Sequence, residues 1–348
     1  MPSRPIYLDH AATTPLLPEA MAAMEAGWRV WANPSSPHAA GRAARAALED
    51  ARARLKAALG WRGEVIFTSG ASEALAIGIG RAKVGQVLVS AVEHDAALRV
   101  AGTAPRLPVG ADGRVDPNGT ERYMSGTDRA LYVVQQVNSE TGVIQDIAAL
   151  ADRVRSGGHL LLCDAAQGAG KIDLPDADMV VLSAHKFGGP VGVGALLVRD
   201  YGLLEPSGGQ ERGYRGGTEA MPLVLGMVAA LEAGNGWLKR ALGFRESLTN
   251  QIVDMGAEIV AGDAPRSPTI AAYRMPGKSS AAQLIRFDGA GIAVSAGSAC
   301  SSGSLKASHV LTAMGYAHPG EVIRVSIGRE TTEAEIARFV EVWKGIRG

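Results

Sequence analysis

The sequence is poor in cysteine, carries no net charge and lacks long hydrophobic runs, and each absence excludes a class of protein. Its 348 residues include only two cysteines, too few for a disulfide framework, which favours a reducing cytoplasm. Lys plus Arg and Asp plus Glu each number 35, so the charge gives no reason to expect nucleic-acid or membrane-surface binding. No apolar run approaches the roughly 18 residues that span a bilayer. We also expect no signal peptide, because Met1 leads quickly into a short apolar stretch.

Glycine, by contrast, is abundant, and 44 glycines indicate many tight turns or close approaches of the backbone to a ligand. Between about residues 19 and 233, helical patterns alternate with short apolar runs bounded by Gly, Ser or Asp. This pattern is typical of an α/β layer with a mostly parallel sheet that is buried on both faces. The expected strands are 65–68, 87–90, 130–135, 159–163, 179–183 and 194–198, and the expected helices include 42–59 and 147–154.

The alternation of helical patterns with short apolar runs ends before about Leu238, where a long helical segment begins. Further strands are expected at 269–274 and 322–326, and further helices at 281–287 and 305–314. The last helix is predicted to open at Thr332, because Thr332 and Glu335 have the spacing of a capping box. We therefore expect a large α/β domain at 15–237 and a smaller α+β domain formed by 1–14 and 238–348.

The two cysteines lie in contrasting surroundings. Cys163 ends an apolar run and is predicted to be a core residue, whereas Cys300 lies among the glycines, serines and alanines of 295–304. Such a composition is typical of a mobile surface loop. Because cysteine is otherwise among the most buried residue types, Cys300 is predicted to be an exposed nucleophile. A metal site joining Cys300 to His309 or His94 lacks close ligand spacing, so we expect no metal.

A lysine and an aspartate follow two of the expected strands. Lys186 comes after strand 179–183 and just before two glycines, a position suited to a Schiff base, and Asp164 follows strand 159–163. In one parallel sheet both side chains would emerge at the same carboxyl edge, where open α/β sheets bind ligands. An acid beside such a lysine has a specific use, because it keeps a pyridine nitrogen protonated. The structural alternative is a pair of unrelated surface salt bridges.

Two weaker patterns point to the same edge. Ser69 and Gly70 form a turn between a strand and a probable helix, whose free N–H groups suit an anion, and Ser72 can add a hydroxyl. His94 follows strand 87–90, where an imidazole can stack on a planar ring and transfer protons. Each pattern alone is also common in purely structural settings.

Nine short motifs, in order over nearly the whole chain, strengthen this interpretation. They are Tyr7–Pro15, Asn33–His38, Phe67–Ala71, Glu93–His94, Asp164–Gln167, Ser183–Lys186, Arg212–Thr218, Gly297–Cys300 and Ile323–Ser326. Together they resemble the cysteine desulfurases, pyridoxal 5'-phosphate enzymes of aminotransferase class V. The resemblance implies a fold type I aminotransferase-like architecture. The cysteine loop is similar to that of group I members, which serve iron-sulfur cluster assembly and tRNA thiolation.

The resemblance also implies residue roles. Lys186 would bind the cofactor covalently, Asp164 would pair with the pyridine nitrogen, Gln167 would bond the ring hydroxyl and His94 would stack on the ring. The phosphate would be held by Ala71, Ser72, Ser183 and His185, with Thr218 reaching in from a partner subunit of a homodimer. Arg324 would clamp the carboxylate of L-cysteine with its planar fork of donors, and Asn33 would line the substrate side.

By the same resemblance, the freed Lys186 removes the α-proton of the substrate and the thiolate of Cys300 takes the substrate sulfur. The products are alanine and a persulfide on Cys300. His94 or the cofactor site is expected to assist deprotonation of the thiol. The loop then carries the persulfide to a protein acceptor, such as an iron-sulfur scaffold or a sulfur carrier.

Three positions depart from the family pattern. Where the family has two asparagines before an acid, this chain has Asn138 and Ser139, so Ser139 takes the position that contacts the ring hydroxyl, with Asn138 as a weak substitute. Ser72 replaces the usual phosphate-loop threonine. The chain stops at Gly348, whereas many group I members continue into a tail that helps dock a scaffold.

Other activities stay open at this stage. A selenocysteine lyase, or another class V lyase or aminotransferase, is the main alternative, and Cys300 argues against chemistry that needs no thiol. A non-catalytic sulfur-assembly partner is a further alternative. The joint presence of the site residues argues against it, because such a partner would need none of Lys186, Asp164, His94, Cys300 and Arg324.

Overall fold

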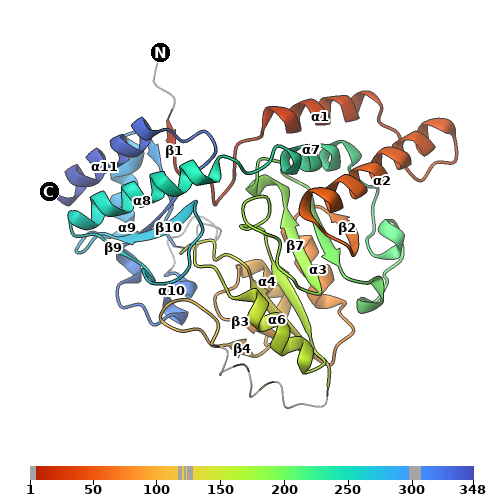
Figure 1. The fold of residues 1–348 in the computed structure, drawn as a ribbon, viewed down its shortest axis with the longest axis horizontal. Coiled ribbons are helices and arrows are strands. Elements are labelled where there is room, and N and C mark those ends of the chain that lie inside the picture. Colours follow the sequence, from red (N-terminus) through yellow and green to blue (C-terminus); the bar gives the residue numbers. More distant parts are fainter. Residues whose placement is uncertain (1–4, 117–119, 121–122, 124–127, 298–306) are drawn as a thin grey trace.

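The computed structural model describes residues 5–116, 120, 123, 128–297 and 307–348. Its centre is a seven-stranded sheet with the order β2-β8-β7-β6-β5-β3-β4, shown on the right of Figure 1. The strands are β2 (Glu64–Thr68), β3 (Gln86–Ser90), β4 (Arg106–Leu107), β5 (Ala130–Gln135), β6 (Leu160–Asp164), β7 (Met179–Ser183) and β8 (Gly194–Val198). Only β8 runs against its neighbours. The predicted α/β fold with a mostly parallel sheet is therefore confirmed.

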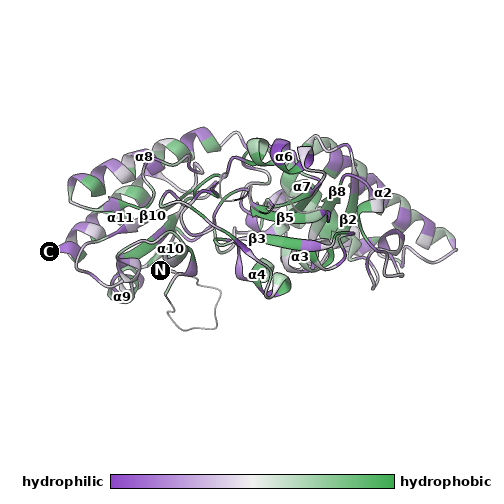
Figure 2. Ribbon diagram, turned by 90° about the horizontal axis from the view of Figure 1, so that it is seen from below, coloured by the Kyte–Doolittle hydropathy of each residue, from purple (hydrophilic) through white to green (hydrophobic). Residues whose placement is uncertain are grey.

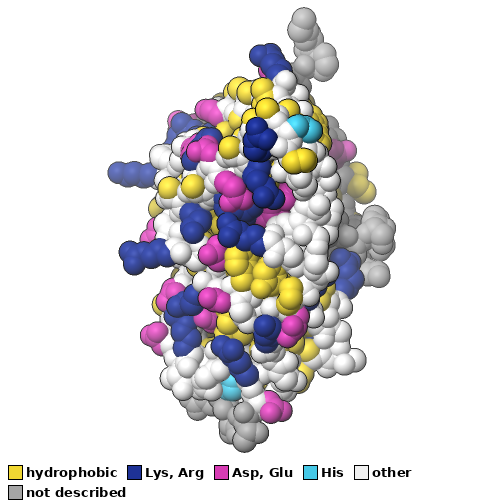
Figure 3. Space-filling view, turned by 90° about the vertical axis from the view of Figure 1, so that its right-hand side faces the viewer, with side chains coloured by type: hydrophobic (Ala, Val, Ile, Leu, Met, Phe, Trp, Pro, Cys, Tyr) yellow, Lys and Arg dark blue, Asp and Glu magenta, His cyan; other side chains and the backbone are white. Residues whose placement is uncertain are grey.

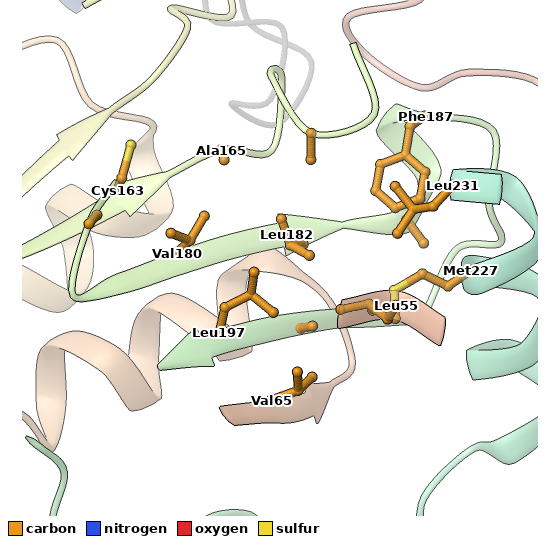
Figure 4. Packing of buried hydrophobic residues seen from close by; sticks show 14 of the residues in the cluster. Leu55, Val65, Cys163, Ala165, Val180, Leu182, Phe187, Leu197, Met227 and Leu231 are labelled. Atoms are coloured by element: carbon orange, nitrogen blue, oxygen red, sulfur yellow. The ribbon is translucent and has the colours of Figure 1, made fainter. Parts of the chain in front are cut away.

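Helices cover both faces of this sheet (Figure 2). One face packs against α1 (Pro18–Arg29), α2 (Ala39–Leu59), α6 (Ile147–Ser156) and α7 (Met221–Glu232), and the other packs against α3 (Ala71–Gly80) and α4 (Asp95–Ala101). Figure 4 shows Leu182 and Leu197 of the sheet in the same buried cluster as Met227 and Leu231 of α7. Successive strand residues alternate between the two cores, because side chains in a strand alternate between faces. This two-sided burial explains the continuous apolar runs in the sequence.

The helix boundaries follow from local caps. Helix α2 begins at Ala39, three residues before the predicted start, because the His38 side chain accepts a hydrogen bond from Gly41 N–H. It ends at Gly60, whose φ of 64° is the left-handed conformation typical of a C-terminal cap. Helix α10 (His309–Ala313) is shorter than the predicted 305–314, because Ser308 caps it and accepts from Leu311 N–H. Residues 305–306 lie outside the described part.

A smaller body follows in the chain. Its antiparallel sheet has the order β12 (Val322–Ser326), β10 (Ile270–Arg274), β9 (Glu258–Ile259), and a two-stranded pair joins β1 (Ile6–Tyr7) to β11 (Ile292–Ala293). The helices α8 (Leu238–Asp254), α9 (Ser280–Gly289) and α11 (Glu333–Arg347) pack around a core that contains Leu8 and Trp343. The capping box of α11 between Thr332 and Glu335 is present, as predicted. The remaining elements are the 3-10 turns η1 (Ala184–Lys186), η2 (Tyr201–Leu203), η3 (Glu211–Gly213) and η4 (Pro319–Glu321).

Basic and acidic side chains are interspersed over the face seen in Figure 3, without one large patch of a single sign. None of the helices in the described ranges is long and apolar enough to cross a membrane. Cys163 is fully buried, so its prediction as a core residue is confirmed.

Candidate active site

A cavity of about 420 Å³ opens at the carboxyl edge of the large sheet. Strand ends and helix starts supply its wall, as expected for ligand sites in open α/β sheets. The predicted residues that line it are Ala71, Ser72, His94, Ser139, Asp164, Gln167, Ser183, His185, Lys186 and Arg324. The structure thus gathers residues that are up to 253 positions apart in the sequence, from 71 to 324, into one concave site.

Lys186 projects from η1, the short turn that follows β7. Its Nζ donates to the carbonyl oxygens of Ala11 and Ala12, each at 2.7 Å. Thr14 Oγ1 in turn donates to the Lys186 carbonyl at 3.1 Å. The N-terminal segment therefore fixes the amine at the cavity wall before any ligand is bound.

Asp164 ends β6 and is only 7% exposed. Burial raises the pKa of this carboxyl, and the Ala166 N–H, which donates to Oδ1 at 2.9 Å, acts in the opposite direction together with the charges of His94 and Lys186. A buried carboxyl of this kind gains most from a cationic partner that replaces the lost water. A protonated ring nitrogen is such a partner.

His94 is the N-terminal cap of α4. Its Nδ1 accepts from the Ala96 N–H at 3.1 Å, so a neutral imidazole carries its proton on Nε2. Gln167 also lines the cavity and donates through Nε2 to the Ala11 carbonyl at 2.8 Å, while its Oε1 is buried without a partner among the described residues. A buried amide oxygen left in this state calls for a ligand donor.

The start of α3 forms the end of the cavity that suits an anion. Gly70 precedes the helix with a φ of 149°, a conformation that favours glycine, and the N–H groups of the first turn are free for a phosphate. Ser183 and His185 line the same cavity. Burial, then the charges of Lys186 and Lys171, lower the pKa of His185 to about 4, so its imidazole is neutral at pH 7 and can donate a hydrogen bond.

Arg324 of β12 brings the smaller sheet to the cavity. Its Nη2 donates to Asp9 Oδ1 at 2.6 Å and its Nη1 donates to the Ser139 carbonyl at 3.0 Å. These bonds fix the plane of the guanidinium, and Nε is buried without a partner. A fork of donors held in this way is suited to a carboxylate.

Three predicted residues of the described part do not line this cavity. The side chain of Asn138 is buried and donates to the Val92 carbonyl, while its Oδ1 accepts from Glu140 N, Thr141 N and Thr141 Oγ1. These internal bonds hold a tight turn, and Asn138 is not among the residues that line the cavity. Asn33 and Thr218 are exposed and away from the cavity. Cys300 lies outside the described residues.

Several residues that matter to the site were not singled out from the sequence. Asp9 lies within the first motif and Lys171 follows the Asp164 motif, so the signal was present but carried no assigned role. Glu73 accepts from Ser69 N–H and pairs with Arg215 at 3.1 Å, which joins the α3 start to residues 211–218. Nothing in the sequence shows that this pair meets.

The site fits pyridoxal 5'-phosphate on its own geometry. A buried carboxyl, a lysine amine and an unpartnered amide oxygen lie on the wall of a cavity whose other end is a helix N-terminus. No group of three or more His, Cys, Asp or Glu side chains suited to a metal occurs in the described ranges. The fold and the site thus define the class of fold type I pyridoxal-phosphate enzymes.

Comparison with known proteins names the family. The aminotransferase class-V family matches residues 6–339, and this chain belongs to it. A cysteine desulfurase of Cereibacter sphaeroides is 35% identical, with 97% of this chain and 94% of the relative covered. One of Bradyrhizobium diazoefficiens is 38% identical, with 97% and 93% covered.

Solved structures agree with these relatives. A NifS-like protein from Rickettsia africae has a TM-score of 0.90 at 28% identity and covers 98% of this chain and 99% of its own. SspA in complex with cysteine has a TM-score of 0.79 at 28% identity, with 94% and 100% covered. The protein is a pyridoxal phosphate-dependent cysteine desulfurase. The alternatives of a selenocysteine lyase, another class V activity and a non-catalytic partner are not favoured.

Proposed function

We propose that Lys186, Asp164 and Arg324 have separate roles in cysteine desulfuration at this cavity. The observation that carries the proposal is that these three side chains, from three separate segments, line one concave site. The bound cofactor supplies an electron-withdrawing ring that accepts charge from the substrate α-carbon. Asp164 would keep the ring nitrogen protonated, and Arg324 would orient the substrate through its carboxylate.

The other cavity residues hold and aim the cofactor. Ser72, Ser183, His185 and the backbone N–H groups of Ala71 and its neighbours bind the phosphate at the α3 start. Gln167 and Ser139 line the same cavity and would hold the ring hydroxyl, a role that the unpartnered Gln167 oxygen supports. His94 would stack on the ring and could move protons there. Lys186, held by two carbonyls, removes the proton from the substrate α-carbon.

Cys300 accepts the sulfur. Its thiol and the substrate cysteine together yield a persulfide on Cys300 and alanine, so that the thiol proton and the substrate hydrogens balance in the two products. The persulfide passes to a protein acceptor, an iron-sulfur scaffold or a carrier for tRNA thiolation. We infer that this work takes place in the cytoplasm, where free thiols persist.

The two cysteines allow a matched test. We expect Cys300→Ala to retain the absorbance of the bound cofactor and to lose formation of alanine and sulfide from cysteine. Cys163→Ala is the control, because burial raises the pKa of the Cys163 thiol well above its usual range and makes it unreactive. Full activity in Cys300→Ala would disprove the persulfide role.

The cofactor anchor is tested separately. Lys186→Ala should lose the absorbance of the lysine-bound cofactor, since Nζ is the only atom of this side chain able to bond it covalently. A variant that keeps the wild-type spectrum would show that another amine is the anchor.

A further inference from the structure

A second, much smaller cavity adjoins the active site. It has a volume of about 20 Å³, enough for about one water molecule, and it shares Ala11 and Lys186 with the larger cavity. The charged or titratable side chains on its wall are all basic, namely His10, Lys171, Lys186 and Arg329. No carboxylate belongs to this wall. Lys186 therefore stands between the substrate cavity and a pocket of basic groups.

Lys171 is the unusual member of this group. It is 7% exposed, and no carboxylate pairs with it within the described ranges. The turn that places it is fixed by the Lys171 N–H, which donates to the Gly168 carbonyl at 2.9 Å. Burial, followed by the charge of Lys186, lowers the pKa of the Lys171 amine to about 7. A buried lysine without a counter-ion is costly, which indicates that its charge has a use.

Two of the other titratable groups near Lys186 are neutral histidines, and a third is an arginine that bonds backbone carbonyls. Burial and then the charge of Lys171 lower the pKa of His10 to about 4, and the pKa of His185 is likewise about 4, so both imidazoles are neutral at pH 7. Arg329, which also lines the small cavity, donates to the carbonyls of Ala233 and Gly234.

On the substrate side, the charged groups have partners of their own. Glu73 pairs with Arg215, and Arg324 pairs with Asp9. Asp164, which shares this wall with His94, is committed to the ring nitrogen when cofactor is bound. Among the described residues on the walls of the two cavities, Lys171 is thus a charged group with no ion pair and no task in the proposed reaction.

We propose that Lys171 is a positioning residue for the reaction, acting from the small cavity to disfavour an extra proton on the Lys186 amine. Two ammonium groups that share one low-dielectric region repel each other, so the pair holds fewer protons than two separate lysines. Lys186 then meets the substrate in the form that can accept the α-proton. This inference rests on the proposed role of Lys186 as the cofactor-binding base.

The test is a pH titration of the absorbance of the bound cofactor. Removing the Lys171 charge in Lys171→Met should favour protonation at Lys186 and raise the midpoint by about one pH unit or more. The acid limb of the cysteine-turnover profile should move in the same direction. Lys171→Arg keeps a permanent charge and should hold the midpoint at or below the wild-type value.

Lys83→Met, which removes an exposed lysine, is the matched control and should leave the midpoint unchanged. A Lys171→Met protein that binds cofactor and titrates as the wild type does would overturn the proposal. If Lys171→Met does not fold, Lys171→Arg decides, and a midpoint above the wild-type value would overturn it. Lys186→Ala tests the role of Lys186 separately from that of Lys171. A cofactor absorbance band that persists and titrates in this variant would refute the role of Lys186 itself.

Discussion

At the scale of single residues, the site depends on side chains whose direction is fixed before the substrate arrives. Arg324 is the best example, since Asp9 and the Ser139 carbonyl hold two of its nitrogens. Ordering this long side chain in advance reduces the entropy lost when a carboxylate binds. The side chain is 8% exposed, so its charge is only partly screened by water.

We expect Arg324→Gln to raise the KM for cysteine roughly 10- to 100-fold, because charge-assisted hydrogen bonds contribute about 1.5–3 kcal/mol. Asp9→Asn should give a smaller rise, since it removes only the group that aims the guanidinium. Steady-state kinetics measure both, and the cofactor spectrum should stay unchanged. Arg338→Gln, on the surface of α11 with Glu341 as its partner, is the control. An unchanged KM in Arg324→Gln would assign the substrate carboxylate to another group.

Residue identity predicted some of these contacts and missed others for a physical reason. Lys186 and Asp164 could be predicted because strand ends in a parallel sheet share an edge. Asn138 could not be placed, because an amide can be satisfied either by a ligand or by its own turn. Glu140 N–H and Thr141 N–H donate to Asn138 Oδ1, so the Asn138 amide is used within its own turn. Ser139 lines the cavity instead.

At the scale of elements, the anion end of the cavity is made by the way α3 leaves β2. Gly70 has a φ of 149°, and a Cβ added at Gly194 of β8 would lie 2.7 Å from the Gly70 Cα. The backbone turns sharply here against a neighbouring strand. This turn brings the start of α3, from Gly70 to Ser72, to the cavity.

Gly70→Ala should therefore weaken cofactor binding about 10-fold or more, because this backbone conformation costs a residue with a Cβ about 1–3 kcal/mol. Its matched control is Gly80→Ala at the other end of α3, where an added Cβ meets open space and φ is not positive. That change should leave binding unchanged and stabilise the protein by up to about 1 kcal/mol. Cofactor titration and urea unfolding measure the two effects. Equal losses of affinity in both variants would count against a phosphate site at the α3 start.

Element boundaries were largely predictable where an apolar run ends in a turn residue. The strands β5, β7 and β8 have the predicted limits, since both of their faces are buried over their whole length. Helix limits were less predictable, because capping side chains decide them. His38 lengthens α2 and Ser308 shortens α10 by bonds that an apolar pattern does not reveal.

At the scale of the whole molecule, two observations support a homodimer. Trp28 is 53% exposed, Val30 65% and Trp31 43%, an apolar group next to the end of α1 that water disfavours. Thr218 is exposed and does not line the cavity of its own chain. Both features fit a second copy that covers the tryptophans and receives Thr218 at its phosphate.

Two inactive variants should then rescue each other. Thr218→Glu repels phosphate and Lys186→Ala lacks the base, so each homodimer should be almost inactive. A purified heterodimer, selected with two affinity tags, has one intact site of two and should recover about half of the wild-type rate. The control pairs Lys186→Ala with Asp164→Ala, two residues of one cavity, and should recover nothing beyond the parent variants. A Thr218→Glu heterodimer that also stays inactive would place Thr218 in its own site or in none.

The sequence by itself determined the α/β class, the buried cysteine and the meeting of Lys186 and Asp164 at one sheet edge, because these depend on local patterns and on where strands end. The tertiary structure decided which side chains meet across the chain. The fold pairs Arg324 with Asp9 and Glu73 with Arg215, although long stretches of sequence separate them. It also places Lys171 and Lys186 on the wall of one small cavity. Electrostatic effects depend on distance and burial, and neither is written in the order of residues. The uncompensated charge of Lys171 is therefore visible only in the folded chain.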